Sequence, residues 1–264
     1  MKLKNLISVV LLMISVGQVR FIYAQYPYES KPAIKYTAYK RWKVNRRTDT
    51  TTDYSITVPG FFAGQQSLNI KVANSKNRVN SVFSLFKNGK PIGRFVIDSF
   101  AISPPHMGYN PKAVYIEDIN GDGLNDLKIA IPFYGGCGGF NFYAQIIYLL
   151  QQANGKFKAI CFNDWMDNED FPNRPERDFD GDHNFEIVTK SFQNYGTHNY
   201  ELYNLYDFRN GKLFNVNAKA DYPLLIQLLW EPNYKATNKV PKKQVKKLAK
   251  PLPDDFEQLK IKWF

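Results

Sequence analysis

One pattern occurs twice in this chain, and this repeat limits the fold more than any other feature of the sequence. The two copies begin at Asp118 and Asp178, 60 residues apart. Each has an acidic turn, a strand-like run, a loop rich in glycine or asparagine, a tyrosine-rich run, an Asn-Gly pair and a last strand-like run. Such a unit predicts an antiparallel meander headed by an acidic loop. Its repetition predicts sheets that pack face to face, as a sandwich or as propeller-like blades.

The segment before the repeat also predicts strands. Short runs of alternating apolar and polar residues follow one another between residues 33 and 118. The pair Asn88-Gly89 joins two of these runs in a way that is typical of a β-hairpin. Aromatic residues make up 16% of the chain, which favours strands because aromatic rings suit a pleated, half-buried surface. The expected fold class is therefore all-β, built from antiparallel meanders.

The first residues have the features of a secretory signal peptide. Lys2 and Lys4 precede an apolar run of eleven residues, 6–16. This run is too short to cross a bilayer as a helix, which takes about 20 residues. Ala24 is the expected last residue before cleavage. The mature protein is therefore expected to be exported, either to the periplasm or out of the cell.

The net charge of +11 comes mostly from two segments. Three basic residues lie in the expected signal peptide, and residues 232–251 contain seven lysines and no acidic residue. The rest of the chain is nearly neutral. The lysine-rich stretch fits either a solvated tail or a peripheral contact with an anionic surface, such as lipid headgroups or cell-wall polymer. Nucleic acid is not expected as a partner, because the chain has no recognised nucleic-acid-binding motif.

These features divide the chain into four parts. The parts are a signal peptide (1–24), an N-terminal β region (25–110), two acidic-loop β repeats (111–217) and a C-terminal segment with the lysine-rich stretch (218–264). Within the last part, residues 222–230 fit either a helix or a buried strand.

Both acidic turns have oxygen-bearing residues at positions 1, 3, 5 and 9. In a tight loop, alternate side chains converge on one point. Their oxygens, together with a backbone carbonyl at position 7, are the ligands that Ca²⁺ prefers. The sequence therefore predicts two Ca²⁺ sites, in loops that each join two strands. The expected ligands are Asp118, Asn120, Asp122, Leu124 and Asp126 in the first loop, and Asp178, Asp180, Asp182, Asn184 and Glu186 in the second.

The turns themselves require residues that tolerate a positive φ. Gly121, Gly123 and Gly181 supply this freedom, and His183 takes the place of the second glycine in the second loop. The loops are not EF-hands, because position 12 is not glutamate and strand-like residues follow. The alternatives to calcium are a solvated turn held by its own backbone and a catalytic carboxylate pair. Carboxylates saturated by Ca²⁺ are poor general acids, which disfavours the second alternative.

The stretches DINGDGLNDLKIAI and DFDGDHNFEIVTKSF resemble the calcium loops of FG-GAP/VCBS-repeat proteins. The similarity covers about residues 111–217. It implies a loop between two strands of a propeller blade, with the last carboxylate at position 9. With YGGCGGFNFY and NGKF, the layout is also similar to small exported bacterial proteins, some of which bind and inhibit cell-wall lysing enzymes.

No motif of a familiar catalytic site occurs in the sequence. H-E-x-x-H, the P-loop, G-x-S-x-G and C-x-x-C are all absent. The chain is therefore expected to be a non-enzymatic binding protein for a protein or a cell-envelope glycan, and the resemblance implies inhibition of a wall-degrading enzyme as one version. The alternatives are a Ca²⁺-dependent enzyme that acts on carbohydrates or phosphoesters, and a structural envelope component.

Two loops are the expected contact surface, because glycine, asparagine and tyrosine offer exposed backbone and adaptable aromatic contacts. These loops are 134–142 and 193–200. The residues expected to contact the partner are Tyr134, Asn141, Tyr195 and His198.

The two cysteines, Cys137 and Cys161, are expected to stay unpaired. If Asn154-Gly155 is a two-residue turn, Tyr148 lies opposite Cys161, near the acidic end of the meander. Cys137 then lies beyond the other end of a strand of about 20 Å. A disulfide needs Cα atoms within about 7 Å of each other, so this arrangement excludes the bond.

Overall fold

The computed structural model describes most of the chain. The described residues are 27–47, 52–74, 80–97, 113–134, 142–165, 174–196, 198–209, 211–228 and 240–264. Residues 32–264 form one compact unit, and residues 1–31 form another. The expected signal peptide, 1–24, lies outside the described residues. The described part of the first unit contains the 3-10 turn η1 (Pro27–Ser30).

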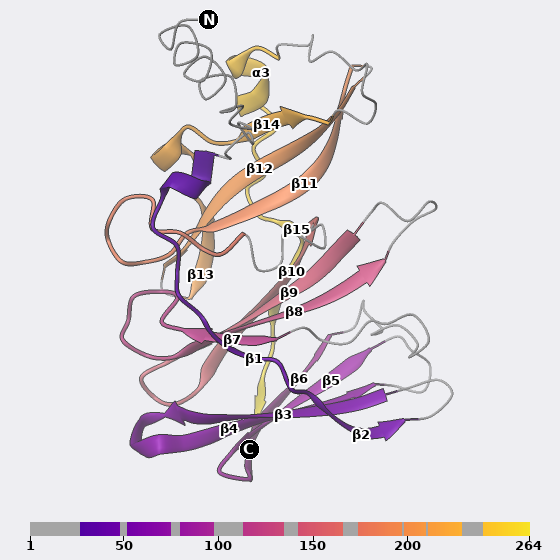
Figure 1. The fold of residues 1–264 in the computed structure, drawn as a ribbon, viewed down its shortest axis with the longest axis vertical. Helices are drawn as coiled ribbons and strands as arrows, with labels where there is room; N and C mark the ends of the chain where they lie inside the picture. Colours follow the sequence, from indigo (N-terminus) through magenta and orange to yellow (C-terminus); the bar gives the residue numbers. More distant parts are fainter. Residues whose placement is uncertain are drawn as a thin grey trace, which may run out of the picture. The chain divides into compact units, whose positions relative to one another are not determined.

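The first of three antiparallel sheets, here called the N-terminal sheet, has six strands in the order β16-β6-β5-β4-β3-β2 (Figure 1). Its strands are β2 (Lys43–Arg47), β3 (Thr52–Phe62), β4 (Gln66–Asn74), β5 (Ser81–Lys87), β6 (Lys90–Ile97) and β16 (Lys262–Trp263). The short turn η2 (Ala63–Gln65) links β3 to β4. The hairpin between β5 and β6 turns at Asn88 and Gly89, whose φ angles are 46° and 79°, as the Asn-Gly pair predicts.

The second sheet, here called the middle sheet, has the order β1-β7-β8-β9-β10-β15. Its strands are β1 (Thr37–Tyr39), β7 (Val114–Glu117), β8 (Asp126–Tyr134), β9 (Phe142–Gln151), β10 (Phe157–Trp165) and β15 (Asp254–Leu259). The first acidic loop joins β7 to β8, so it is a strand-loop-strand element.

The third sheet, here called the C-terminal sheet, begins after the second acidic loop. Its strands are β11 (Ile187–Tyr195), β12 (His198–Arg209), β13 (Lys212–Asn215) and β14 (Leu224–Gln227). β12 pairs with β11 and with both β13 and β14. β14 shows that the ambiguous run 222–230 contains a strand. The turn η4 (Asn217–Ala220) and the short helix α3 (Lys242–Lys246) complete the segment.

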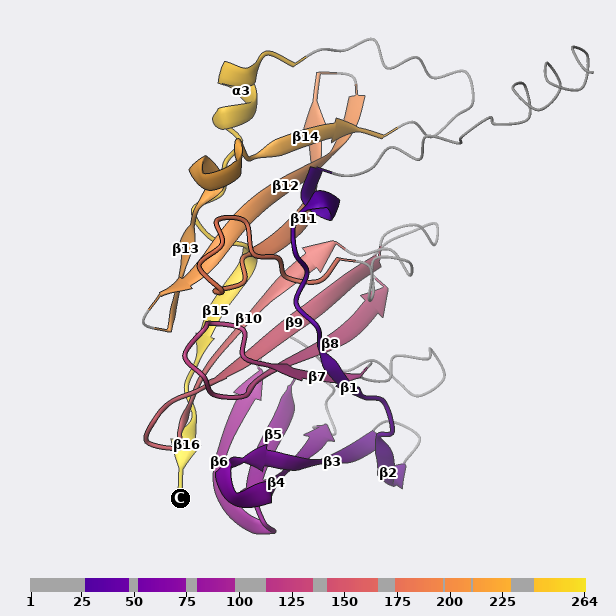
Figure 2. The same cartoon turned by 60° about the vertical axis from the view of Figure 1, so that its left-hand side comes forward.

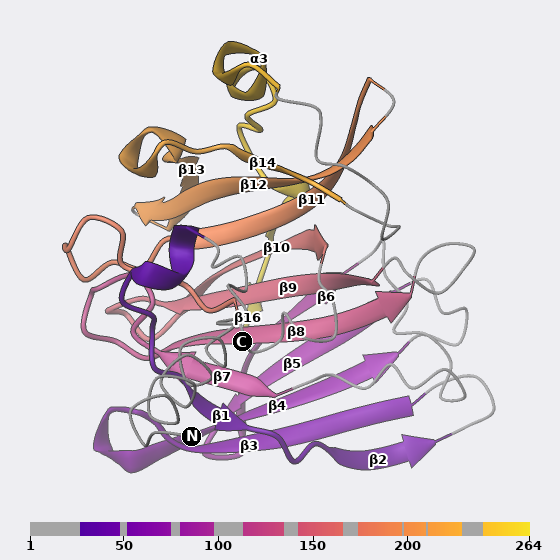
Figure 3. The ribbon, with the colours of Figure 1, turned by 45° about the horizontal axis from the view of Figure 1, so that its top comes forward.

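The middle sheet is covered on both faces, which makes the arrangement a layered sandwich (Figure 2). One core joins it to the N-terminal sheet and includes Ile147 from β9 together with Leu85 and Phe95. A second core joins it to the C-terminal sheet, as where Tyr148 packs with Phe208. Neighbouring residues of β9 therefore point into different cores, because side chains alternate along a strand. The expected all-β, antiparallel fold class is confirmed (Figure 3).

The register around Cys161 differs from the expected one. Cys161 pairs with Ile147, and Tyr148 pairs with Ile160. The expectation of a two-residue turn was wrong, because a five-residue connection, 152–156, joins β9 to β10. Cys161 is a free, buried thiol, as expected, and Cys137 lies outside the described residues.

A buried ion pair connects the middle sheet to the segment before the second acidic loop. Lys128 on β8 donates to the Glu176 carboxylate at 2.6 Å, and both side chains are almost fully buried. The hydroxyl groups of Tyr36 and Tyr148 also donate hydrogen bonds to the Glu176 carboxylate. Burial works to raise the pKa of Glu176, but Lys128 and these hydrogen bonds outweigh it and lower the pKa. The carboxylate is thus held in its charged form within the core.

Among the described residues, no helix is long and apolar enough to cross a membrane.

Candidate metal centre

The ninth residue closes each acidic loop in the same way. Asp126 accepts a hydrogen bond from the backbone N–H of Ile119 at 3.1 Å, and Glu186 accepts the equivalent bond from Phe179 at 2.8 Å. Both carboxylates are completely buried. The sequence repeat therefore corresponds to a repeat in hydrogen bonding, in which a carboxylate at position 9 satisfies the N–H at position 2.

The fifth residue has an equivalent role in both loops as well. Asp122 accepts a bond from the N–H of Leu124 at 2.9 Å, and Asp182 accepts one from the N–H of Asn184 at 2.9 Å. Such local bonds from a backbone N–H to a nearby carboxylate form Asx turns, which fix where the carboxylate oxygens lie. Hydrogen bonds within each loop therefore help to hold its backbone in place.

The backbone of both loops has the left-handed conformations that the sequence predicts. The φ angles are 71° at Gly121, 81° at Gly123, 82° at Gly181 and 65° at His183. Histidine therefore adopts in the second loop the conformation that Gly123 adopts in the first, at the cost of some strain.

The two loops contact each other, although they start 60 residues apart. The N–H of Phe185 donates to the carbonyl of Ile119 at 3.0 Å. A Cβ atom on Gly121 would lie only 3.1 Å from the carbonyl oxygen of His183, which is a tight contact, and the φ of 71° also favours glycine at this position. Tertiary structure thus joins the two repeats at their acidic ends.

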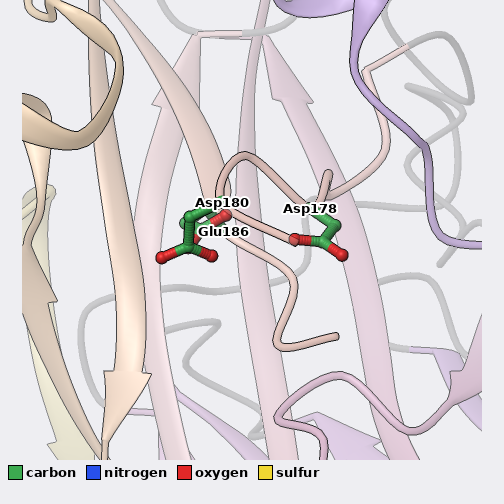
Figure 4. A group of neighbouring side chains, drawn as sticks. All are labelled: Asp178, Asp180 and Glu186. Atoms are coloured by element: carbon green, nitrogen blue, oxygen red, sulfur yellow. The ribbon is translucent and has the colours of Figure 1, made fainter. Parts of the chain in front are cut away.

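The second loop brings together the group that could hold a metal ion. Asp178, Asp180 and Glu186 each offer a carboxylate oxygen, and these oxygens lie within 4.8 Å of one another (Figure 4). Within the described part of the chain, this is the one such group of three or more histidine, cysteine, aspartate or glutamate side chains. Hard oxygen donors of this kind suit hard divalent cations. Asp182 is not a member of the group.

A lysine far along the chain lies among these carboxylates. The Nζ atom of Lys219, on η4, is 2.6 Å from Asp180 and 2.5 Å from Glu186. Burial works to lower the pKa of Lys219, but its hydrogen bonds to the two carboxylates outweigh burial and raise it. The bond from Lys219 lowers the pKa of Asp180. Burial raises the pKa of Glu186 in spite of the lysine.

A fourth carboxylate joins the second cluster from β12. Asp207 lies 3.3 Å from Nζ of Lys219, and it also pairs with Arg209 at 3.0 Å. The side-chain amide of Asn184 donates to Asp207. The backbone carbonyl of Asn184 was the expected ligand, whereas the structure shows that its side chain links the loop to β12. No pattern in the sequence pointed to Asp207 or Lys219, because both lie outside the loop.

In the described part of the chain, no lysine enters the first loop in this way. Within the described residues, no lysine, arginine or histidine forms an ion pair with Asp118, Asp122 or Asp126. Both oxygens of Asp126 accept backbone N–H groups, from Ile119 and from Gln151. Burial raises the pKa of Asp126 to about 8. The first loop therefore differs from the second in that none of the described residues supplies it with a cation.

The residues expected to contact a partner lie away from the acidic loops. Tyr195 and His198 face each other across the turn between β11 and β12, at the end of β11 opposite to Glu186. Nine residues of β11 separate the two ends, or about 30 Å at the usual rise. Tyr134 is the last residue of β8, at the end of that strand opposite to Asp126. Asn141 lies outside the described residues.

Comparison of the chain with protein-family models, with curated protein sequences and with solved structures finds no match.

Proposed function

We propose that this chain is an exported calcium-binding protein that acts by non-enzymatic binding of a protein or a cell-envelope glycan. The observation that supports it best is the group of Asp178, Asp180 and Glu186, whose oxygens lie within 4.8 Å of one another. Both loops have the alternate oxygen donors and the positive-φ turns on which Ca²⁺ loops depend. Calcium would offset the repulsion between their carboxylates and fix the entry into β8 and β11.

Calcium in the second loop requires that Lys219 moves. Its ammonium group lies between Asp180 and Glu186, where a cation would share the same oxygens. The Lys219 side chain is 16% exposed, so it has a route to solvent. The first loop has no competing cation among the described residues, but its carboxylates do not form such a group, so Asp118, Asp122 and Asp126 would have to rearrange to bind calcium.

The proposed role of calcium is structural. The acidic loops and the proposed contact residues Tyr195 and His198 lie at opposite ends of β11. The ion would therefore act on the partner surface through the strands that it holds in place. In this proposal the ion does not take part in catalysis.

Calorimetry on protein that has been stripped of metal by a chelator tests the proposal. We expect two calcium-binding events in the unmodified chain and one in either Asp122→Ala or Asp180→Ala. Asp221→Ala is the matched control, because this exposed aspartate pairs with Lys242 outside the loops. Absence of calcium heat in the unmodified chain, together with an unchanged melting curve, would refute calcium binding.

The binding function needs a separate test. The tagged protein is used to capture partners from a cell-envelope extract, with and without chelator. We expect Tyr195→Ala and His198→Ala to reduce capture and to leave calcium binding unchanged. Capture that persists in both variants would show that this turn is not the contact surface.

A further inference from the structure

The outer face of the N-terminal sheet has one row of residues that crosses all six strands. Each residue of the row is the direct cross-strand partner of the next. This row, here called the cationic row, consists of Lys43, Ser55, Lys71, Ser84, Arg94 and Lys262. Four of its six members are basic and none is acidic.

The row faces solvent. In β3, β4, β5 and β6, the residues that flank the row members point into the core, such as Ile70 and Phe95, and the row members point away from it. The four basic side chains are all exposed. The serines between them are small, so a ligand can approach the sheet closely along the row.

The charges of the row are not neutralised within the described structure. None of the four basic residues forms an ion pair there. Asp53 lies in the neighbouring row, opposite Arg46. Lys71 lies over the ring of Phe86 at 4.7 Å, which leaves its charge available. Four positive charges in a line therefore form a local positive field, within a region (25–110) whose sequence has thirteen basic and four acidic residues.

The spacing of these charges suits a regularly charged chain. Neighbouring strands lie about 4.8 Å apart, so Lys43, Lys71 and Arg94 follow one another at roughly 10 Å. This is close to the length of a disaccharide in an extended glycan. A polysaccharide with one carboxylate in each disaccharide would match Lys43, Lys71 and Arg94, while Lys262, one strand beyond Arg94, adds a second positive charge at that end of the row.

The twist of the sheet favours a linear ligand over a flat one. Adjacent strands are rotated by roughly 20–25°, so the side chains of the row turn by about 100° from β2 to β16. A flat membrane could contact only part of such a curved line. A flexible polymer could follow all of it.

Single-stranded nucleic acid fits the row less well. Its binding relies on aromatic rings on which successive bases stack. Phe86 is the aromatic residue next to Lys71 on this face, and it is half-buried beneath that lysine. A carboxylated sugar chain needs no such stacking platform.

We propose that the cationic row binds a linear anionic polysaccharide that has one carboxylate in each disaccharide. This inference deepens the proposed binding function, on which it rests, by naming the class of glycan and the surface that holds it. The row does not include any residue of the acidic loops, so it can be tested separately from calcium.

The test is a titration of the full mature chain with hyaluronan oligosaccharides in low salt, in the presence of chelator. We expect saturable binding that weakens by about tenfold or more in Lys71→Gln/Arg94→Gln, since two charged contacts are lost. The matched control is Lys35→Gln/Lys212→Gln, which removes the same charge from exposed positions outside the N-terminal sheet and outside the lysine-rich stretch. We expect it to change the affinity by less than about twofold. Melting temperatures establish that both variants are folded.

Several results would overturn the inference. They are absence of binding, equal loss in both double variants, or equal binding of a neutral linear glucan. Tighter binding to phosphatidylserine vesicles or to single-stranded oligothymidine would identify a membrane or a nucleic acid instead. The titration is done in chelator, so its outcome does not depend on calcium binding. Failure of the glycan titration can therefore be distinguished from failure of calcium binding in the calorimetry.

Discussion

Nζ of Lys219 lies 2.5 Å from Oε1 of Glu186, a carboxylate with no exposed surface, and this pair places a cation of the protein within the second acidic loop. The first loop has the same hydrogen bond from position 2 to position 9 but no lysine among the described residues. The two loops thus share the same local hydrogen bond, but among the described residues only the second has a lysine that pairs with its carboxylates.

Replacement of Lys219 by methionine should destabilise the calcium-free protein. Glu186 would be left buried without its charged partner, and breaking such a pair costs about 3–5 kcal/mol. Urea unfolding in chelator measures the change in the free energy of unfolding. Lys212→Met is the control, because Lys212 is exposed on the neighbouring β13. Equal effects of the two substitutions would contradict a specific role for Lys219.

The same substitution should strengthen calcium binding in the second loop. The ion would no longer compete with an ammonium group for Asp180 and Glu186. Loss of one charged hydrogen bond from the free state corresponds to an affinity gain of about tenfold. Calorimetry on Lys219→Met and on the unmodified chain measures the gain. Weaker binding in the variant would mean that Lys219 supports the site.

Gly121→Ala should destabilise the protein more than Gly123→Ala. Both residues have a positive φ, which costs a residue with a Cβ about 1–2 kcal/mol. Only at Gly121 would the new Cβ also press on the His183 carbonyl, whereas Gly123 has open space around it. We expect an additional loss of about 1 kcal/mol at Gly121, measured by urea unfolding. Equal losses would show that the contact between the loops adds nothing to stability.

Removal of Lys128 should destabilise the core through Glu176. Lys128→Met leaves this buried carboxylate without its cation, at a cost of about 3–5 kcal/mol. The double variant Lys128→Met/Glu176→Gln removes both charges and should regain much of the loss. A double-mutant cycle of unfolding free energies measures the coupling. Additive effects would contradict an ion pair that acts as one unit.

The thiol of Cys161 should resist alkylation in the native state. Burial raises its pKa to about 12, so the reactive thiolate is scarce at pH 8, and its population rises only as the pH approaches that value. In a Cys137→Ser background, we expect iodoacetamide to label Cys161 only after denaturation. Mass spectrometry of the labelled protein gives the extent. Rapid labelling of the folded protein would contradict the buried position.

Local sequence was enough to predict the turns. Asn88, Gly89 and the positive-φ positions of the acidic loops adopt the expected conformations, because steric limits on φ act within single residues. The alternation of apolar and polar residues predicted the strands for the same reason, since the period of a strand is a local property. The register of β9 with β10 was not predictable in this way, because it depends on how many residues the connection uses.

The sequence by itself determined an antiparallel all-β chain with two oxygen-rich loops, because turn residues and alternation act over a few neighbours. Tertiary structure alone decided what surrounds those loops. Lys219 and Asp207 reach the second loop from 33 and 21 residues beyond Glu186. Tertiary structure also placed Lys43 and Lys262 in the same cross-strand row. No spacing in the sequence relates these two residues, and only the pairing of the strands brings them into line. Coulomb energy depends on distance in space, so the charge balance of this protein is a property of its packing.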